Sequence, residues 1–220
     1  DQTVSIALAG SMYLRVGWDG FPNGAVTQVV SALRNGPAEY YLGAGGCLTG
    51  EALELLAWWN AQVSGPGVDV IRLGTNDISN TLTETIIRNA TAVFDARRAA
   101  GRRLVICGEP ARYKIGTTVL DAPQLQSLIA INKSYRAYAE KYPDSCRFVD
   151  LYAMSADPNY SDGRPAANWL QDHVHDGPLG ATAFGNAIAA AAVALGLRIA
   201  PYPMRGDTNL FPAGWMTGTG

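Results

Sequence analysis

The stretch from Val68 to Asp77, VDVIRLGTND, constrains the fold more than any other part of this chain. It is a short apolar run rich in β-branched residues, and it stops at a glycine and a group of small polar residues. Such a run predicts a strand buried on both faces, as at the centre of a parallel sheet. Because ligands bind at the carboxyl ends of the strands of open α/β sheets, Asn76 and Asp77 are candidate site residues. The alternative is that Thr75, Asn76 and Asp77 only end the strand and turn the chain.

Around this strand, apolar segments with strand and helix patterns alternate along the chain. Further strands are expected at residues 4–8, 39–42, 103–107 and 147–151. Helices are expected at residues 26–33, 49–59, 81–97, 121–142 and 181–195, with Thr49 capping the second and a capping box of Thr81 and Glu84 starting the third. The alternation predicts one α/β domain, residues 1–200, with a doubly wound sheet of five parallel strands. Residues 201–220 lack periodicity and are expected to be a tail or the start of a following module.

Composition excludes several classes of partner. The 220 residues are 48% hydrophobic and 16% charged, which is enough for one compact core. The net charge is −2 and no run of lysine or arginine occurs, so neither a nucleic-acid nor a membrane partner is expected. No signal-peptide pattern and no membrane-spanning run are found. Cys47, Cys107 and Cys146 form no CxxC pair, so buried free thiols are expected.

Chemically useful residues follow the first three expected strands. Ser11 follows the first strand, Gly46 the second and Asn76 the third, so all three are expected at one edge of a parallel sheet. Asp172 and His175, in the sequence DHVH, come just before the last expected helix and are placed to fold back on that edge.

These residue types suit nucleophilic catalysis. A serine hydroxyl is a poor nucleophile until a base removes its proton, and His175 can be that base. Asp172 can accept the other imidazole N–H and fix the tautomer. The backbone N–H groups of Ser11 and Gly46 and the side-chain amide of Asn76 would stabilise an oxyanion. Taken singly, each has a plain alternative, namely a helix cap, a turn or a surface hydrogen bond.

The ordered set AGS, LGAGG, GTND and DHVHDG resembles the SGNH (GDSL-like) hydrolase family, over roughly residues 3–196. The resemblance implies a three-layer α/β/α flavodoxin-like sandwich with strand order 2-1-3-4-5, and ester hydrolysis through an acyl-enzyme without a cofactor. It implies that Ser11 is the nucleophile, His175 the general base and Asp172 its orienting partner. It also implies an oxyanion hole formed by Ser11, Gly46 and Asn76.

The chain departs from the family pattern in the first two blocks. Ala9 and Gly10 stand where the family usually has glycine and an acidic residue, and Tyr41 stands where it has asparagine. The oxyanion donor of the second block is therefore Gly46 or one of its neighbours, Gly43 and Gly45.

Other sites match the sequence less well. His173 and His175 form an HxH pair, but the chain has no third histidine, so no metal site is expected. DPNYSDG has Asp162 where a calcium loop needs glycine and Asn168 where it needs glutamate. GAGGCLTGE lacks the third glycine of a dinucleotide fingerprint, and Glu51 replaces the lysine of a phosphate loop.

The expected substrate is an O-acetyl group on a carbohydrate or polysaccharide. The irregular segment 154–171 leads into DHVH and brings Tyr160 and Trp169 to the catalytic edge, and Tyr13 and Trp18 follow Ser11. Aromatic faces with polar rims suit sugar rings.

The tail TNLFPAGW resembles the start of an appended β-domain in phage-tail or secreted carbohydrate-active proteins, which implies a larger multidomain protein outside the cell or on a virion. The alternatives are a lipid or acyl-thioester hydrolase and a decayed hydrolase that binds glycans.

Overall fold

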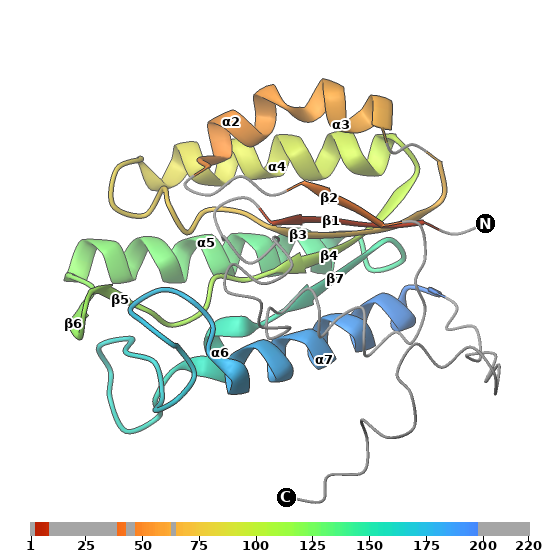
Figure 1. Ribbon diagram of the computed structural model, residues 1–220. Helices are drawn as coiled ribbons and strands as arrows, with labels where there is room; N and C mark the ends of the chain where they lie inside the picture. Colours follow the sequence, from red (N-terminus) through yellow and green to blue (C-terminus); the bar gives the residue numbers. More distant parts are fainter. Residues whose placement is uncertain (1–2, 9–38, 43–46, 63–64, 198–220) are drawn as a thin grey trace, which may run out of the picture.

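The computed structural model describes residues 3–8, 39–42, 47–62 and 65–197, with only the backbone path for the first two stretches. Five parallel strands form the main sheet in the order β2-β1-β3-β4-β7 (Figure 1). The strands are β1 (Thr3–Leu8), β2 (Glu39–Leu42), β3 (Gly67–Arg72), β4 (Arg102–Cys107) and β7 (Cys146–Val149). The predicted parallel sheet and its strand order are confirmed.

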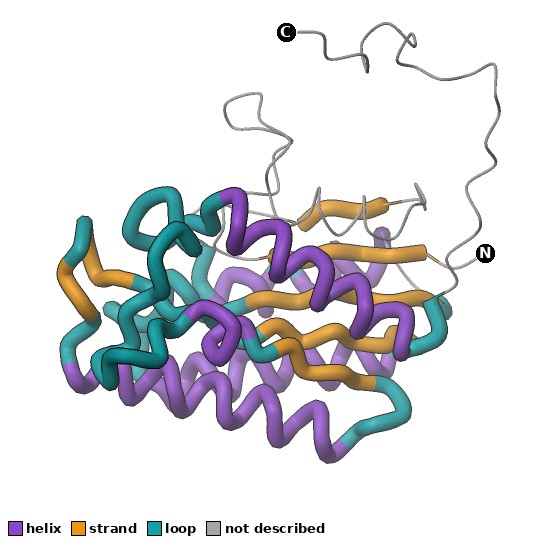
Figure 2. The backbone as a smooth tube through the Cα atoms, turned by 90° about the horizontal axis from the view of Figure 1, so that it is seen from below, coloured by secondary structure: helices purple, strands orange, loops and turns teal. Residues whose placement is uncertain are grey.

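Helices cover both faces of this sheet (Figures 1 and 2). One face carries α2 (Thr49–Glu54), α3 (Leu56–Gln62), α4 (Thr83–Ala99) and α5 (Ala122–Lys141). The other face carries α7 (Pro178–Ala194), and the short α6 (Leu151–Ser155) follows β7. The predicted three-layer sandwich is therefore confirmed. Within the described residues, no helix is long and apolar enough to cross a membrane.

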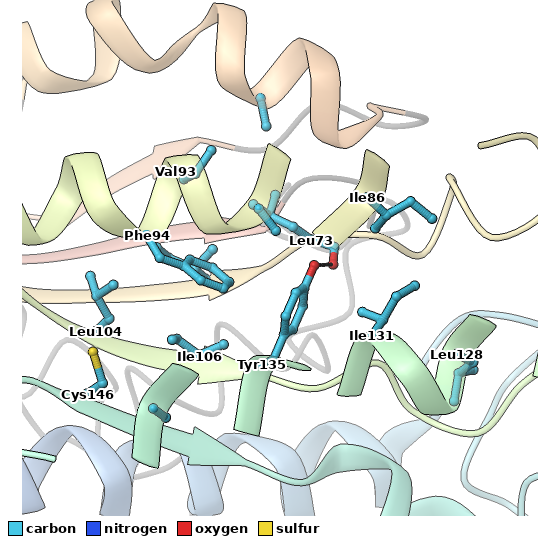
Figure 3. Close-up of a cluster of buried hydrophobic side chains, with 14 of the residues drawn as sticks. Leu73, Ile86, Val93, Phe94, Leu104, Ile106, Leu128, Ile131, Tyr135 and Cys146 are labelled. Atoms are coloured by element: carbon cyan, nitrogen blue, oxygen red, sulfur yellow. Dashed lines mark hydrogen bonds between the residues drawn. The ribbon is translucent and has the colours of Figure 1, made fainter. Parts of the chain in front are cut away.

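The central strand β3 supplies side chains to both cores. All of its residues are buried. Val68 and Val70 belong to the apolar cluster under α7, whereas Ile71 and the following Leu73 belong to the cluster under α4 and α5, part of which Figure 3 shows. This alternation is the period of two that a strand imposes on its side chains, and it makes β3 the rigid base from which the GTND turn projects.

The starts of two helices differ from the prediction. The helix expected from residue 81 begins at Thr83 after the N-cap residue Leu82, so the predicted capping box is wrong. The helix expected over 49–59 is divided at Leu55, and Thr49 is the first residue of α2 and not its cap. The physical reason is shared: Thr49 and Thr81 both direct their hydroxyl groups to the carboxylate of Asp77.

A small hairpin and a short helix were not predicted from the sequence. A small antiparallel hairpin joins β5 (Tyr113–Ile115) to β6 (Thr118–Val119). The last strand also ends two residues early, because the Asp150 carboxylate accepts a hydrogen bond from the backbone N–H of Ala153 and starts α6.

The expected buried, free state of Cys47, Cys107 and Cys146 is confirmed. The helix predicted at 26–33 and the tail 201–220 lie outside the described residues.

Candidate active site

Asn76 lies on a tight turn directly after β3. Gly74 begins this turn with a φ of 124°, a conformation that L side chains rarely adopt. The turn is closed by a hydrogen bond from the backbone N–H of Asp77 to the Gly74 carbonyl, at 3.0 Å. From α5, the Tyr135 hydroxyl donates to the Leu73 carbonyl at 2.8 Å (Figure 3). The position of Asn76 is therefore set by the strand, the turn and the packed helix together.

Asp77 and Asn76 join this turn to the segment that follows Gly46. The Asp77 carboxylate accepts hydrogen bonds from the backbone N–H and the hydroxyl of Thr49, at 3.0 and 2.8 Å. The Asn76 side-chain amide donates to the carbonyl of Cys47 at 3.1 Å. Burial raises the pKa of Asp77, while its hydrogen bonds with Thr49 oppose this shift. The turn after β3 and the start of α2 are thus brought side by side.

Asp172 and His175 form the pair that the sequence predicts. Nδ1 of His175 lies 2.6 Å from Oδ2 of Asp172. The other carboxylate oxygen accepts hydrogen bonds from the backbone N–H groups of Val174 and His175, each at 2.8 Å. Because the carboxylate is held by two backbone donors, it fixes Nδ1 as the protonated nitrogen and leaves Nε2 as the nitrogen that can accept a proton.

The loop that carries Asp172 and His175 is held by backbone hydrogen bonds within the loop and to β5. Leu170 and Asp176 form an antiparallel bridge, and the Gln171 N–H donates to the His175 carbonyl at 2.9 Å. From β5, the Tyr113 N–H donates to the His173 carbonyl, also at 2.9 Å. The hairpin that the sequence did not reveal therefore supports the loop that presents His175.

The surroundings of His175 favour its neutral form. Partial burial lowers the pKa of His175 below its ordinary value of 6.5, and the negative charge of Asp176 opposes this shift. A histidine that is neutral near pH 7 can act as a general base.

A buried ionic group that the sequence did not predict connects the turn that carries Asn76 to the loop that carries His175. Arg72, the last residue of β3, contacts Glu109 at 3.5 Å and Asp176 at 3.2 Å. Thr75 donates its hydroxyl to the same Glu109 oxygen. An arginine inside a strand predicted to be buried was the available signal, because a charged side chain is almost never fully buried without partners.

The structure describes only some of the remaining predicted site residues. Ser11, Gly46, Tyr13 and Trp18 lie outside the described residues. The backbone of β1 ends at Leu8, which pairs with Arg72, so the strand that leads to Ser11 ends beside the strand that leads to Asn76. The two strands thus end at the same edge of the sheet.

Tyr160 and Trp169 lie in different surroundings. The Tyr160 side chain is exposed, and the Arg164 guanidinium lies 3.8 Å from its ring centre. Trp169 is partly buried against the core under α7, with its ring centre 5.4 Å from that of Phe184. Trp169 therefore anchors the loop before DHVH, and contact with substrate stays a prediction for both residues.

The described part of the chain contains no group of three or more His, Cys, Asp or Glu residues arranged to hold a metal ion. In the calcium-like segment, Asp162 is paired with Arg164, and the Asp157 carboxylate accepts hydrogen bonds from the backbone and side chain of Asn159. These carboxylates are thus engaged by their own neighbours.

Comparisons with known proteins agree with the geometry. The sequence matches no protein-family model and no curated protein sequence. Among solved structures, similar ones include a Bacteroides fragilis protein described as an acylhydrolase, with a TM-score of 0.68, 19% identity and 87% of each chain covered. A GDSL-like lipase from Parabacteroides merdae has a TM-score of 0.63 and 20% identity, over 90% of this chain and 98% of that one. An acetyl xylan esterase has a TM-score of 0.60 and 17% identity, over 85% and 98%.

The sheet order, the helix layers and these similarities lead to one conclusion: the chain has the fold of the SGNH (GDSL-like) hydrolases.

Proposed function

We propose that this chain is a carboxylic ester hydrolase that works through an acyl-enzyme. The observation that carries the proposal is the 2.6 Å contact between Asp172 and Nδ1 of His175, on a loop held at the edge of the sheet where Asn76 lies. Ser11 attacks the ester carbonyl carbon while His175 takes its proton, and the alcohol then leaves with that proton. Water next attacks the acyl group on Ser11, with His175 again as base, which releases the acid and restores the serine.

Asn76 is the proposed side-chain donor to the oxyanion, together with the backbone N–H groups of Ser11 and Gly46. A side-chain amide has two N–H bonds. In Asn76 one of them donates to the Cys47 carbonyl, which fixes the amide plane. An amide that is held in this way can meet the charge that develops on the substrate oxygen, and a donor held in advance is the kind that accelerates the reaction.

For the substrate, we propose an O-acetyl group on a carbohydrate, met outside the cell or on a virion and hydrolysed without a cofactor. The exposed ring of Tyr160, on the loop that leads to the catalytic pair, suits stacking on a sugar. One of the similar structures is an acetyl xylan esterase. A longer acyl chain is the second candidate, since another similar structure is a GDSL-like lipase.

Hydrolysis of p-nitrophenyl acetate tests the proposed activity. Ser11→Ala should lower kcat by roughly four to six orders of magnitude without unfolding the chain, as judged by circular dichroism. The exposed Ser161, on the loop before the catalytic pair, provides a matched control, and Ser161→Ala should keep full activity. A folded wild-type protein without turnover would point instead to a glycan-binding module.

Ester chain length tests the proposed substrate. A p-nitrophenyl series from acetate to octanoate should give the highest kcat/KM with acetate, and an acetylated glycan should release acetate. A kcat/KM that rises steadily toward octanoate would exclude the acetyl preference and favour the lipase-like alternative, without affecting the assignment of an ester hydrolase.

A further inference from the structure

A buried series of polar contacts connects the residue before Asn76 to the residue after His175. The Thr75 hydroxyl donates to Oε2 of Glu109, and Nε of Arg72 lies 3.5 Å from the same oxygen. Nη1 of Arg72 lies 3.2 Å from Oδ2 of Asp176. All four side chains belong to residues that are at most 5% exposed. The proposed oxyanion donor and the proposed base are thus adjacent in sequence to the two ends of one buried network.

Arginine is the residue type that this bridge requires. Its planar guanidinium holds Nε and Nη1 in fixed directions, so that one rigid group contacts both carboxylates. Glu109 is itself fixed, because its N–H donates to Asn132 at 2.7 Å and its carbonyl accepts from Asn132 at 2.8 Å. Arg72 is anchored by the hydrogen-bonded strand β3. The network is therefore rigid at both its centre and its Glu109 end.

The network is not an optimal arrangement for stability. Oε1 of Glu109 and Oδ1 of Asp176 are buried and have no hydrogen-bond partner among the described residues. A buried polar atom without a partner costs free energy, and well-packed apolar residues often stabilise a fold as much as buried ions. By contrast, three residues earlier in the same strand, both oxygens of Asp69 are engaged, by Arg97 at 2.6 Å and by Arg102 at 2.7 Å.

We infer that Arg72 is a positioning residue that fixes His175 relative to Asn76, through Asp176 on one side and through Glu109 and Thr75 on the other. This inference rests on the proposed function of the site. Misplacement of a catalytic group by about 1 Å can cost 100-fold in rate, so the effect is expected in kcat and not in KM.

The charge of Asp176 also acts on His175. The carboxylates of Asp172 and Asp176 act on the imidazole directly. The other charged groups of this region act on these carboxylates: Arg72 from β3 contacts Asp176 and Glu109, and Arg112, after β4, interacts with Glu109 and Asp172. Asp176 is the residue next to His175, and its negative charge favours the imidazolium. Removing that charge should lower the pKa of His175, while a change of size only should not.

Three single variants test the inference. Asp176→Asn keeps the size of the side chain and an oxygen that can accept from Arg72, but removes the charge. Arg72→Lys keeps the charge but loses the two-point contact. Asp69→Asn is the matched control, because it removes one charge from a buried ion cluster on the same strand, away from the carboxyl end.

The measurements are kcat and KM for p-nitrophenyl acetate as a function of pH, and NMR titration of the imidazole. The chain has 2 histidines, so His173→Gln isolates the signal of His175. Asp176→Asn and Arg72→Lys should each lower kcat about 10- to 100-fold with little change in KM. Asp176→Asn should also lower the pKa of His175. Asp69→Asn should lower the melting temperature and leave kcat and the His175 titration unchanged.

The inference is overturned if Asp176→Asn leaves both kcat and the His175 titration at wild-type values, or if Asp69→Asn changes them equally. The NMR titration does not depend on activity. If the wild-type protein hydrolyses no ester, the proposed function fails, and an unchanged His175 titration in Asp176→Asn then overturns the coupling of these two residues as a separate result.

Discussion

The carboxylate of Asp77 accepts two hydrogen bonds from Thr49, which lies 28 residues earlier in the chain. This contact joins the turn after β3 to the first residue of α2. One of the proposed oxyanion donors, Asn76, lies on this turn, next to Asp77. Asp77 is therefore a structural support of the site, and its replacement should affect both stability and rate.

Asp77→Ala should lower the free energy of unfolding by about 1–3 kcal/mol, because the buried N–H and hydroxyl of Thr49 lose their acceptor. It should also lower kcat about tenfold through displacement of Asn76. Urea denaturation and steady-state kinetics measure the two effects. Asp121→Ala, which removes the side-chain cap of α5, is the control and should change stability without changing kcat. Equal kcat losses in the two variants would contradict a specific role of Asp77.

Asn76→Ala should lower kcat about 100- to 1000-fold with little change in KM, because an oxyanion donor acts mainly in the transition state. Asn76→Asp keeps the shape of the side chain but removes the donors and adds a negative charge, so it should be at least as damaging. Steady-state kinetics with p-nitrophenyl acetate decide the point. A loss confined to KM would mean that Asn76 binds the substrate in its ground state instead.

The acidic limb of the kcat/KM profile should have its midpoint below pH 6.5. The reason is that His175 must be neutral to accept the proton of Ser11, and burial lowers the pKa of His175 from its ordinary value of 6.5. Activity should therefore persist at a pH where an exposed histidine is mostly protonated. A midpoint above pH 6.5 would show that the negative charges of Asp172 and Asp176 outweigh burial.

Gly74→Ala should destabilise the chain by about 1–3 kcal/mol, since the φ of 124° is strained for any residue with a Cβ. Steric overlap is not the cause, because the added Cβ would meet Ile86 only at 3.4 Å. Gly50→Ala is the matched control: Gly50 lies within α2, its Cβ would meet Asn89 at 3.7 Å, and alanine is the better helix former. Thermal unfolding should show a melting temperature below that of the wild type for Gly74→Ala and above it for Gly50→Ala.

The sequence predicts most of the fold because its strongest signals are local. The buried run Val68–Leu73 and the alternation of strands and helices are sufficient to predict a parallel α/β sheet, and five parallel strands are observed. The buried face of α4, with Ile86, Ala90 and Val93, follows from helical periodicity in the same way. Among the site residues, DHVH predicts the contact of Asp172 with His175 because three residues of separation allow one turn to close.

Features that depend on distant partners were not predictable in this way. Thr49 and Thr81 look like helix caps in the sequence, but Asp77 competes successfully for their hydroxyl groups. Arg72 looks like an interruption of an apolar strand, and its partners Glu109 and Asp176 are 37 and 104 residues away. Only the folded chain shows that these residues meet at the carboxyl end of β3.

The central claim, a serine activated by the pair of Asp172 and His175, is tested most directly by covalent labelling with a fluorophosphonate. Intact-protein mass spectrometry of the wild-type chain should show a single adduct, and peptide mapping should place it on Ser11. The adduct should be absent in Ser11→Ala and form far more slowly in His175→Ala. An adduct on any other residue, or a folded wild-type chain that takes up no label, would contradict the account.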